Sequence, residues 1–127
     1  MIEARERWPD SMTIQEDFVS DVALVRISGR VTLTDGTTVF DDTLQRLTRE
    51  GRNKLILDLK NVPYIDSTAL GIILRAHATV SRRGGTLKLL NLQGHVHELF
   101  ELTHLLTVID AFDSEAQALA SVGVTAS

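Results

Sequence analysis

Short apolar segments alternate with longer amphipathic ones from the middle of the chain to its end. Residues 54–59 (KLILDL) are short and apolar, which is typical of a strand buried on both faces, and residues 86–90 (TLKLL) predict the next strand. The segment from Ser67 to Arg83 repeats its apolar residues at the spacing of a helix. Because strands that alternate with helices need crossover connections, the pattern predicts an α/β fold with a mostly parallel sheet.

The other segments extend this pattern in both directions along the chain. Residues 12–18 and the apolar run at 22–27, separated by Ser20-Asp21, predict an opening antiparallel hairpin. The remaining expected elements are a helix that Thr34-Asp35 caps and Gly51 ends, a helix at 95–102, a strand at 108–109 and a helix that Asp113-Ser114 caps. The expected fold is a single α/β domain of order β-β-α-β-α-β-α-β-α, with a mixed, mostly parallel sheet and about four helices.

A chain of 127 residues has the length of one domain. We expect a flexible leader at residues 1–11, the domain at 12–122 and a short tail at 123–127. The formal net charge of −4 disfavours binding to nucleic-acid phosphates. No apolar stretch is long enough to cross a bilayer and no signal peptide is visible, so we expect a cytoplasmic protein that does not insert into membranes.

Residues that commonly form catalytic or metal sites make no recognisable set in this sequence. The chain has no cysteine, which excludes disulfides, thiolate ligands and cysteine nucleophiles. His95 and His97 diverge on a helix, so no metal or cofactor is expected. Asp58, Asp66 and Ser67 lack a histidine at a motif-defined place, and the common nucleophile and nucleotide motifs are absent. The sequence therefore favours a binding protein over an enzyme, and a small hydrolase is an alternative with only Ser67 in its favour.

Asp66-Ser67-Thr68 lies between a strand end broken by proline and the start of a helix. A hydroxyl at that junction lies among free backbone N–H groups, at the positive end of the helix dipole. Such a setting can accommodate a phosphate attached to the serine, which makes Ser67 a candidate phosphorylation site. The same residue types are ordinary helix N-caps, so a capping role stays open beside the phosphorylation role.

Residues 64–71, Y-I-D-S-T-A-L-G, resemble the phosphorylation-site segment of the STAS domain family, in particular that of bacterial anti-sigma-factor antagonists. The segment L-I-L-D-L-K-N-V before it resembles the central strand of the family, and R-R-G-G-T-L-K-L-L after it resembles the family's helix-to-strand turn. H-E-L-F-E-L-T-H-L-L-T-V-I and D-S-E-A-Q-A-L-A resemble the two remaining helices and the strand between them. In this order and spacing, the resemblance covers about residues 12–122.

The resemblance implies a partner switch. In the family, the unphosphorylated antagonist binds an anti-sigma factor serine kinase that also sequesters a sigma factor, and this binding frees the sigma factor. The kinase then phosphorylates the serine that follows the acidic residue, the antagonist is released, and a serine phosphatase restores it. Carried over to this chain, the acceptor is Ser67 with Asp66 beside it, in a monomer or weak homodimer. The family also includes non-switching subunits of stress-sensing scaffolds and of membrane-transport ATPase complexes, and that alternative stays open.

The expected partner surface combines the start of the second helix with the end of the second strand. We expect the following residues to face the partner: Thr32, Asp66, Thr68, Gly71, Ile72 and Arg75. Glycine lowers helix stability by about 1 kcal/mol relative to alanine. Gly71 therefore indicates close packing, either of a partner or of a neighbouring element of the same chain.

One segment departs from the family's pattern. Many antagonists carry G-x-L-D at the end of the second strand, with the acidic residue near the serine, whereas this chain has Gly29-Arg30-Val31-Thr32. Thr32 therefore stands in the place of the acid, which keeps the non-switching alternative open. Arg30 is either a partner for a phosphate or a solvated side chain at a strand end.

Overall fold

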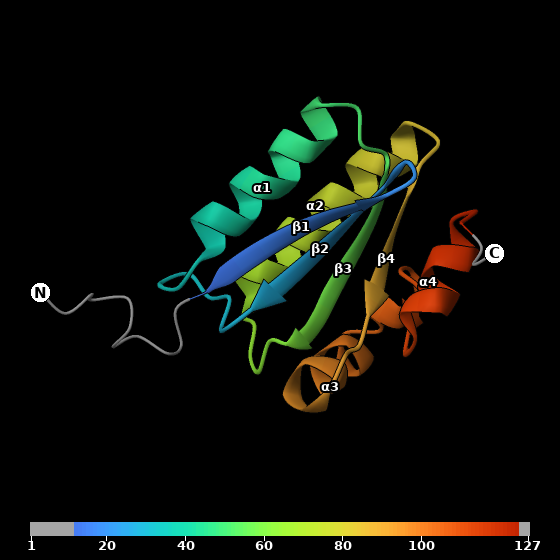
Figure 1. Ribbon diagram of the computed structural model, residues 1–127. Coiled ribbons are helices and arrows are strands. Elements are labelled where there is room, and N and C mark those ends of the chain that lie inside the picture. Colours follow the sequence, from blue (N-terminus) through green and yellow to red (C-terminus); the bar gives the residue numbers. More distant parts are fainter. Residues whose placement is uncertain (1–11, 125–127) are drawn as a thin grey trace, which may run out of the picture.

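A five-stranded sheet forms the centre of the protein, with its strands in the order β1-β2-β3-β4-β5. The computed structural model describes residues 12–124 and is shown in Figure 1. The strands are β1 (Thr13–Val19), β2 (Val22–Ser28), β3 (Lys54–Asn61), β4 (Thr86–Leu90) and β5 (Ala111–Phe112). The helices are α1 (Thr37–Arg49), α2 (Ser67–Arg82), α3 (Gly94–Leu102) and α4 (Glu115–Ser121), and a 3-10 turn spans Leu105–Thr107. The expected α/β fold with its mixed sheet and four helices is confirmed.

The predicted opening hairpin is also confirmed. β1 and β2 pair antiparallel, and Val19 and Val22 form the last pair before the turn. Ser20 in that turn has a φ of 57°, in the left-handed region that two-residue hairpin turns require. The other neighbouring strands pair in parallel, which explains why helical crossovers separate them in the sequence.

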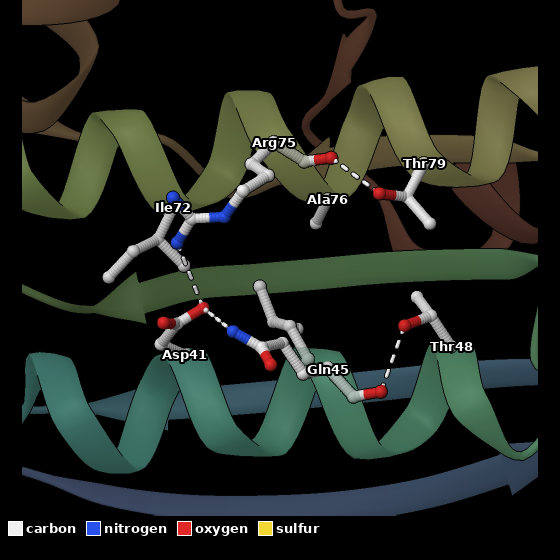
Figure 2. Close-up of a pocket in the computed structure, with 8 residues that line it drawn as sticks. Asp41, Gln45, Thr48, Ile72, Arg75, Ala76 and Thr79 are labelled. Atoms are coloured by element: carbon white, nitrogen blue, oxygen red, sulfur yellow. Dashed lines mark hydrogen bonds and ion pairs between the residues drawn. The ribbon is translucent and has the colours of Figure 1, made fainter.

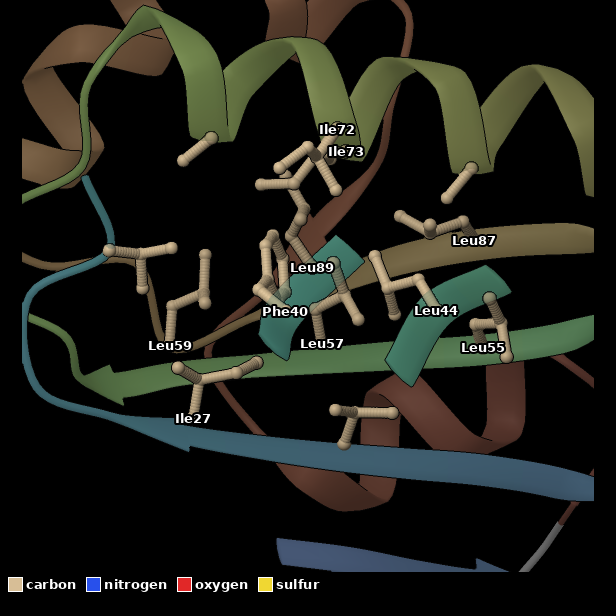
Figure 3. Close-up of a cluster of buried hydrophobic side chains, with 14 of the residues drawn as sticks. Ile27, Phe40, Leu44, Leu55, Leu57, Leu59, Ile72, Ile73, Leu87 and Leu89 are labelled. Atoms are coloured by element: carbon tan, nitrogen blue, oxygen red, sulfur yellow. The ribbon is translucent and has the colours of Figure 1, made fainter. Parts of the chain in front are cut away.

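Helices α1 and α2 cover one face of the sheet, and α4 covers the other (Figure 1). The larger core, shown in Figure 3, joins side chains of α1 and α2 to the sheet, and its members include Phe40, Leu44, Leu57, Ile73 and Leu89. The smaller core lies under α4, and its buried members are Val22, Leu24, Ile56, Leu90, Ala118 and Val122. Because both faces are covered, consecutive residues of a central strand are all buried, as in β3 from residue 55 to residue 59.

The expected leader at residues 1–11 lies outside the described residues, as do residues 125–127. Within the described part, packing continues past the expected domain end at residue 122. Val124 packs partly buried against the smaller core, and its N–H donates to the carbonyl of Leu119. The end of α4 is therefore tied to the sheet through its last turn.

The start of α1 differs from the expected cap. Gly36, with a φ of 87°, is the N-cap residue, and no side chain caps the helix. A Cβ at Gly36 would lie 2.7 Å from the Cβ of Met12, so both the left-handed backbone and the close contact favour glycine there. The prediction that Thr34-Asp35 caps α1 is wrong, because the carboxylate of Asp35 instead accepts a hydrogen bond from the Thr32 hydroxyl.

The last strand also differs from its expected position. The sequence predicts a strand at residues 108–109, whereas β5 is Ala111–Phe112. Ile109 is buried in the larger core, but Val108 is exposed and follows the 3-10 turn. Of the apolar pair Val108-Ile109, which follows the turn, only Ile109 contributes a side chain to the core. The extended backbone of β5 begins two residues later, at Ala111.

Arg26 of β2 joins three elements on the α4 side of the sheet. Its guanidinium is 2.9 Å from the carboxylate of Asp17 on β1, and 3.0 Å from those of Asp58 on β3 and Glu115 at the start of α4. Asp58, which is buried, also accepts hydrogen bonds from the Asn91 side chain and the Lys60 N–H. The Arg26 hydrogen bond is the main cause that lowers the pKa of Asp17 below its usual value of 3.8.

We expect Arg26→Gln to lower the free energy of unfolding by about 2 kcal/mol at pH 7, because it leaves the buried Asp58 without its cation. The loss stays below that of a fully buried pair, since the Arg26 side chain is one-third exposed. The lowered pKa of Asp17 contributes stability above pH 3.8 that disappears as the pH falls through its folded value.

Urea unfolding of both proteins from pH 7 down to about pH 2.5 checks this expectation. The difference between wild type and Arg26→Gln should shrink below pH 3.8. Lys54 lowers the pKa of Asp21 in the same direction, but this pair is present in both proteins and cancels in the difference. A difference that stays constant with pH would contradict the assignment.

Candidate functional site

Ser67 is the first residue of α2 and is exposed. Asp66 is the N-cap residue: its backbone is extended, and its Oδ1 accepts a hydrogen bond of 3.0 Å from the Ala69 N–H. The prediction that Ser67 begins the helix is confirmed, but the capping role belongs to Asp66. Among residues 12–124 nothing hydrogen-bonds the Ser67 hydroxyl, so the described structure leaves this hydroxyl available to an incoming group.

The loop that follows β2 docks directly onto the start of α2. The Val31 N–H donates to the carbonyl of Tyr64 at 3.1 Å, and the Asp66 N–H donates back to the Val31 carbonyl at 3.3 Å. The second carboxylate oxygen of Asp66 accepts a hydrogen bond of 2.7 Å from the Leu33 N–H. The two oxygens of Asp66 therefore hold the helix start and the loop in one fixed arrangement.

Thr32, the residue in the place of the family's acid, is buried with 6% of its surface exposed. Its hydroxyl lies 3.1 Å from the carboxylate of Asp35, and the backbone groups of the two residues exchange hydrogen bonds of 2.9 Å. The expectation that Thr32 faces a partner is wrong, because its side chain shapes the loop from inside. Asp35 instead brings a carboxylate into the same loop, three residues later in the chain.

Three of the residues expected along α2 are exposed: Thr68, Gly71 and Arg75. Ile72 is 5% exposed and belongs to the larger core, so its expected exposure is wrong. The reason is the neighbouring helix: Ile72 points to the side on which α1 packs, as Figure 2 shows. An added Cβ at Gly71 would meet no described atom within 4 Å. Close packing against another element of the described chain therefore does not explain why position 71 is a glycine.

Two hollows flank this region. A groove of about 290 Å³ runs between α1 and α2, where Arg75 of α2 pairs with Asp41 of α1 at 3.1 Å (Figure 2). These two charges neutralise each other, so the pair gives the groove no net charge that would attract an ionic ligand. A shallower hollow of about 540 Å³ lies at residues 60–63 and 93–95, at the carboxyl ends of β3 and β4.

Sequence reasoning missed an aromatic stack that involves Tyr64, three residues before Ser67. The rings of Tyr64 and His95 are stacked, with centroids 4.7 Å apart and planes at 19°, and the Arg30 guanidinium lies 6.0 Å from the centre of the Tyr64 ring. Tyr64 is 39% exposed, and Leu33 on the neighbouring loop is 71% exposed. No local pattern indicates this pairing, because His95 lies on a different helix from the serine motif.

The hydrogen bonds of residues 12–124 include none between the Ser67 side chain and an acidic or basic group. No histidine or carboxylate hydrogen-bonds the Ser67 hydroxyl in the described structure, so nothing there would activate it as a nucleophile. Asp58, the other acid considered from the sequence, pairs with Arg26. Within residues 12–124 no group of three potential metal ligands is close enough to hold an ion.

The fold and the site together define a class: a small α/β domain with an exposed serine at the start of its second helix. A sequence model of the STAS domain matches residues 13–118. The chain therefore belongs to the STAS domain family, as its sequence motifs indicate.

Individual relatives show how similar this chain is to particular proteins in sequence and in fold. The chain is 36% identical over 86 residues to an anti-sigma-B factor antagonist of Bacillus subtilis, an alignment that covers 68% of this chain and 77% of that protein. A structure named as an anti-sigma factor antagonist from Thermotoga maritima superposes with a TM-score of 0.81 at 24% identity, covering 86% of this chain and 93% of that one. The phosphorylated form of the Bacillus cell fate determinant SpoIIAA superposes with a TM-score of 0.68 at 17% identity, covering 87% and 99%.

This similarity places the chain among the anti-sigma factor antagonists, which are regulators and not enzymes. Across the described residues, no helix is both long and apolar enough to span a bilayer.

Proposed function

We propose that this protein is an anti-sigma-factor antagonist that acts by partner switching in the cytoplasm. Unphosphorylated, it binds an anti-sigma factor serine kinase; phosphorylation of Ser67 releases it, and a serine phosphatase restores it. The observation that carries the proposal is the exposed hydroxyl of Ser67 at the start of α2, with the capping role already filled by Asp66. SpoIIAA, which shares the fold, has been solved in a phosphorylated form.

The geometry supplies a physical basis for the switch. A phosphate on Ser67 adds roughly two negative charges beside the carboxylate of Asp66. The positive end of α2 tolerates this charge, so the domain itself need not rearrange. A partner surface that fits the neutral serine would instead meet an uncompensated charge, which weakens binding.

The residues around Ser67 take different roles in this proposal. Thr68, Gly71 and Arg75 are exposed along α2 and form its contact surface for the kinase. Asp66 holds the surface in place, since both of its oxygens are used inside the protein. The argument for the non-switching alternative is that Thr32 stands in the place of the family's acid. Asp35 brings a carboxylate to the same loop, which weakens that argument.

Incubation of the purified chain with its cognate kinase and ATP, followed by peptide mapping, tests the proposal. We expect one phosphate at Ser67, no phosphorylation of the Ser67→Ala variant, and normal phosphorylation of a Ser81→Ala variant as the matched control, because Ser81 is an exposed serine at the other end of α2. Modification at another residue, or no modification while the chain binds the kinase, would contradict the switch. Co-purification in large particles without a kinase would favour a scaffold subunit.

The Gly71→Ala variant separates stability from binding. We expect the free energy of unfolding to rise by about 0.5–1 kcal/mol, because alanine is the better helix former and its Cβ meets no described atom within 4 Å. Binding to the kinase should weaken, because the added methyl group holds the partner away from α2. Urea unfolding and calorimetric titration measure the two effects, and unchanged affinity would remove Gly71 from the contact surface.

A further inference from the structure

Two exposed apolar side chains belong to the segments that are hydrogen-bonded at the start of α2, outside the contact surface on α2 itself. Leu33 is 71% exposed, and its N–H is bonded to the carboxylate of Asp66, the residue before the serine. Tyr64 is 39% exposed and lies two residues before Asp66 in the chain. We call Leu33 and Tyr64 together the loop anchor.

The backbone of Leu33 is held at both sides. On one side, Thr32 and Asp35 exchange backbone hydrogen bonds of 2.9 Å and also pair through their side chains at 3.1 Å. On the other side, the Leu33 N–H reaches Asp66 at 2.7 Å. A leucine presented on an ordered loop loses little further backbone freedom on binding, and its burial gains the full apolar contribution.

Tyr64 is ordered in a different way. Its ring stacks on that of His95 with centroids 4.7 Å apart, and the Arg30 guanidinium lies 6.0 Å from its centre. Tyrosine and arginine are residue types that often carry most of the energy of a protein interface. Leu33 and Tyr64 also lie on two segments that Val31 joins through backbone hydrogen bonds to residues 64 and 66, so one partner surface can reach both.

We propose that the loop anchor is the second half of the kinase-binding surface, inserting Leu33 and Tyr64 into an apolar pocket of the kinase while α2 provides the first half. Asp66 is the positioning residue of this arrangement, because its second oxygen keeps Leu33 in register with Ser67. The inference rests on the proposed function and names a contact area that this function by itself does not require.

Alanine variants of the anchor test the contact directly. We expect Leu33→Ala and Tyr64→Ala each to raise the dissociation constant for the unphosphorylated protein and its kinase about tenfold. Leu102→Ala, at the last residue of α3, is the matched control for Leu33 because Leu102 is also 71% exposed. The control should bind like the wild type, and Leu33→Ala and Leu102→Ala should unfold at the wild-type urea concentration. Tyr64→Ala should unfold at a slightly lower urea concentration, because it loses the stack on His95.

Asp66→Asn tests the positioning role. Asparagine keeps one acceptor oxygen and remains a good N-cap, so the bond to the Ala69 N–H can persist while the bond to the Leu33 N–H is lost. Amide hydrogen exchange should show loss of protection at Leu33 and retained protection at Ala69. Kinase binding should weaken in the wild-type background and change little in the Leu33→Ala background, because Asp66 then has no anchor left to position.

The outcomes separate this inference from the function on which it rests. If the wild type fails to bind the kinase, the proposed function and the anchor fall together. If the wild type binds and is phosphorylated at Ser67, but Leu33→Ala and Tyr64→Ala bind like Leu102→Ala, the anchor alone is wrong. Equal weakening by Asp66→Asn in both backgrounds would overturn the positioning role and leave the anchor in place.

Discussion

We expect the Ser67→Asp variant to bind the anti-sigma factor kinase about a hundredfold more weakly than the unphosphorylated wild type does. The side chain is exposed at the start of α2, so a carboxylate there meets the partner surface directly, and an uncompensated charge in an interface costs about 2–5 kcal/mol. The fold should be unaffected, because an exposed substitution away from the core changes stability by about 0.5 kcal/mol or less. A negative charge at a helix start is even mildly favourable.

Ser67→Ala is the control that separates charge from loss of the hydroxyl. We expect it to bind the kinase with wild-type affinity and to resist release on addition of ATP, because it cannot be phosphorylated. Calorimetric titration of the three proteins against the kinase, with urea unfolding alongside, measures both effects. Equal affinities for the aspartate and alanine variants would show that charge at position 67 does not control docking.

Replacing Gly85 with alanine is expected to destabilise the protein by about 3 kcal/mol or more, the largest single effect on stability that we predict. A Cβ at Gly85 would lie 2.0 Å from the carbonyl oxygen of Asn53, which is backbone and cannot move aside as a flexible side chain would. The same carbonyl accepts the Thr86 N–H at 2.8 Å. The parallel pairing of β3 with β4 begins at this point, with Lys54 opposite Thr86, so relief of the clash would disturb the start of the ladder.

Thermal unfolding monitored by circular dichroism measures this loss, which corresponds to a decrease in Tm of roughly 10 °C or more. Gly71→Ala is a control with the opposite sign, since its Cβ meets no described atom within 4 Å and should raise the Tm. A Gly85→Ala variant with the wild-type Tm would mean that the Asn53 backbone can move away without cost.

Much of the fold was predictable because its signals are local. The mainly apolar sequence of β3 indicated burial on both faces, and the helical spacing after Ser67 located α2. The segment R-R-G-G resembles the family's helix-to-strand turn, and Gly84 has the positive φ of 76° that such a turn favours. These features depend on neighbours a few residues apart, so the periodicity of the chain is enough to indicate them.

Errors arose where a residue's environment depends on a distant segment. The position of Ile72 in the helical repeat fits either a surface or a core residue. It is a core residue because α1 packs beside α2. Val108 and Ile109 have the composition of a strand, but the turn before them leaves one residue in the core and the other in solvent. Single-sequence patterns cannot distinguish such cases, because they do not say which elements become neighbours.

By itself, the sequence determined the element types, the buried central strands and the position of Ser67 at a helix start. The tertiary structure alone decided what surrounds that serine: the carboxylate of Asp66 bridging to Leu33, and the ring of Tyr64 stacked on His95. The physical reason is that periodicity and capping act within a few residues of the chain. Contacts between a loop, a helix start and a later helix exist only after the sheet brings them together.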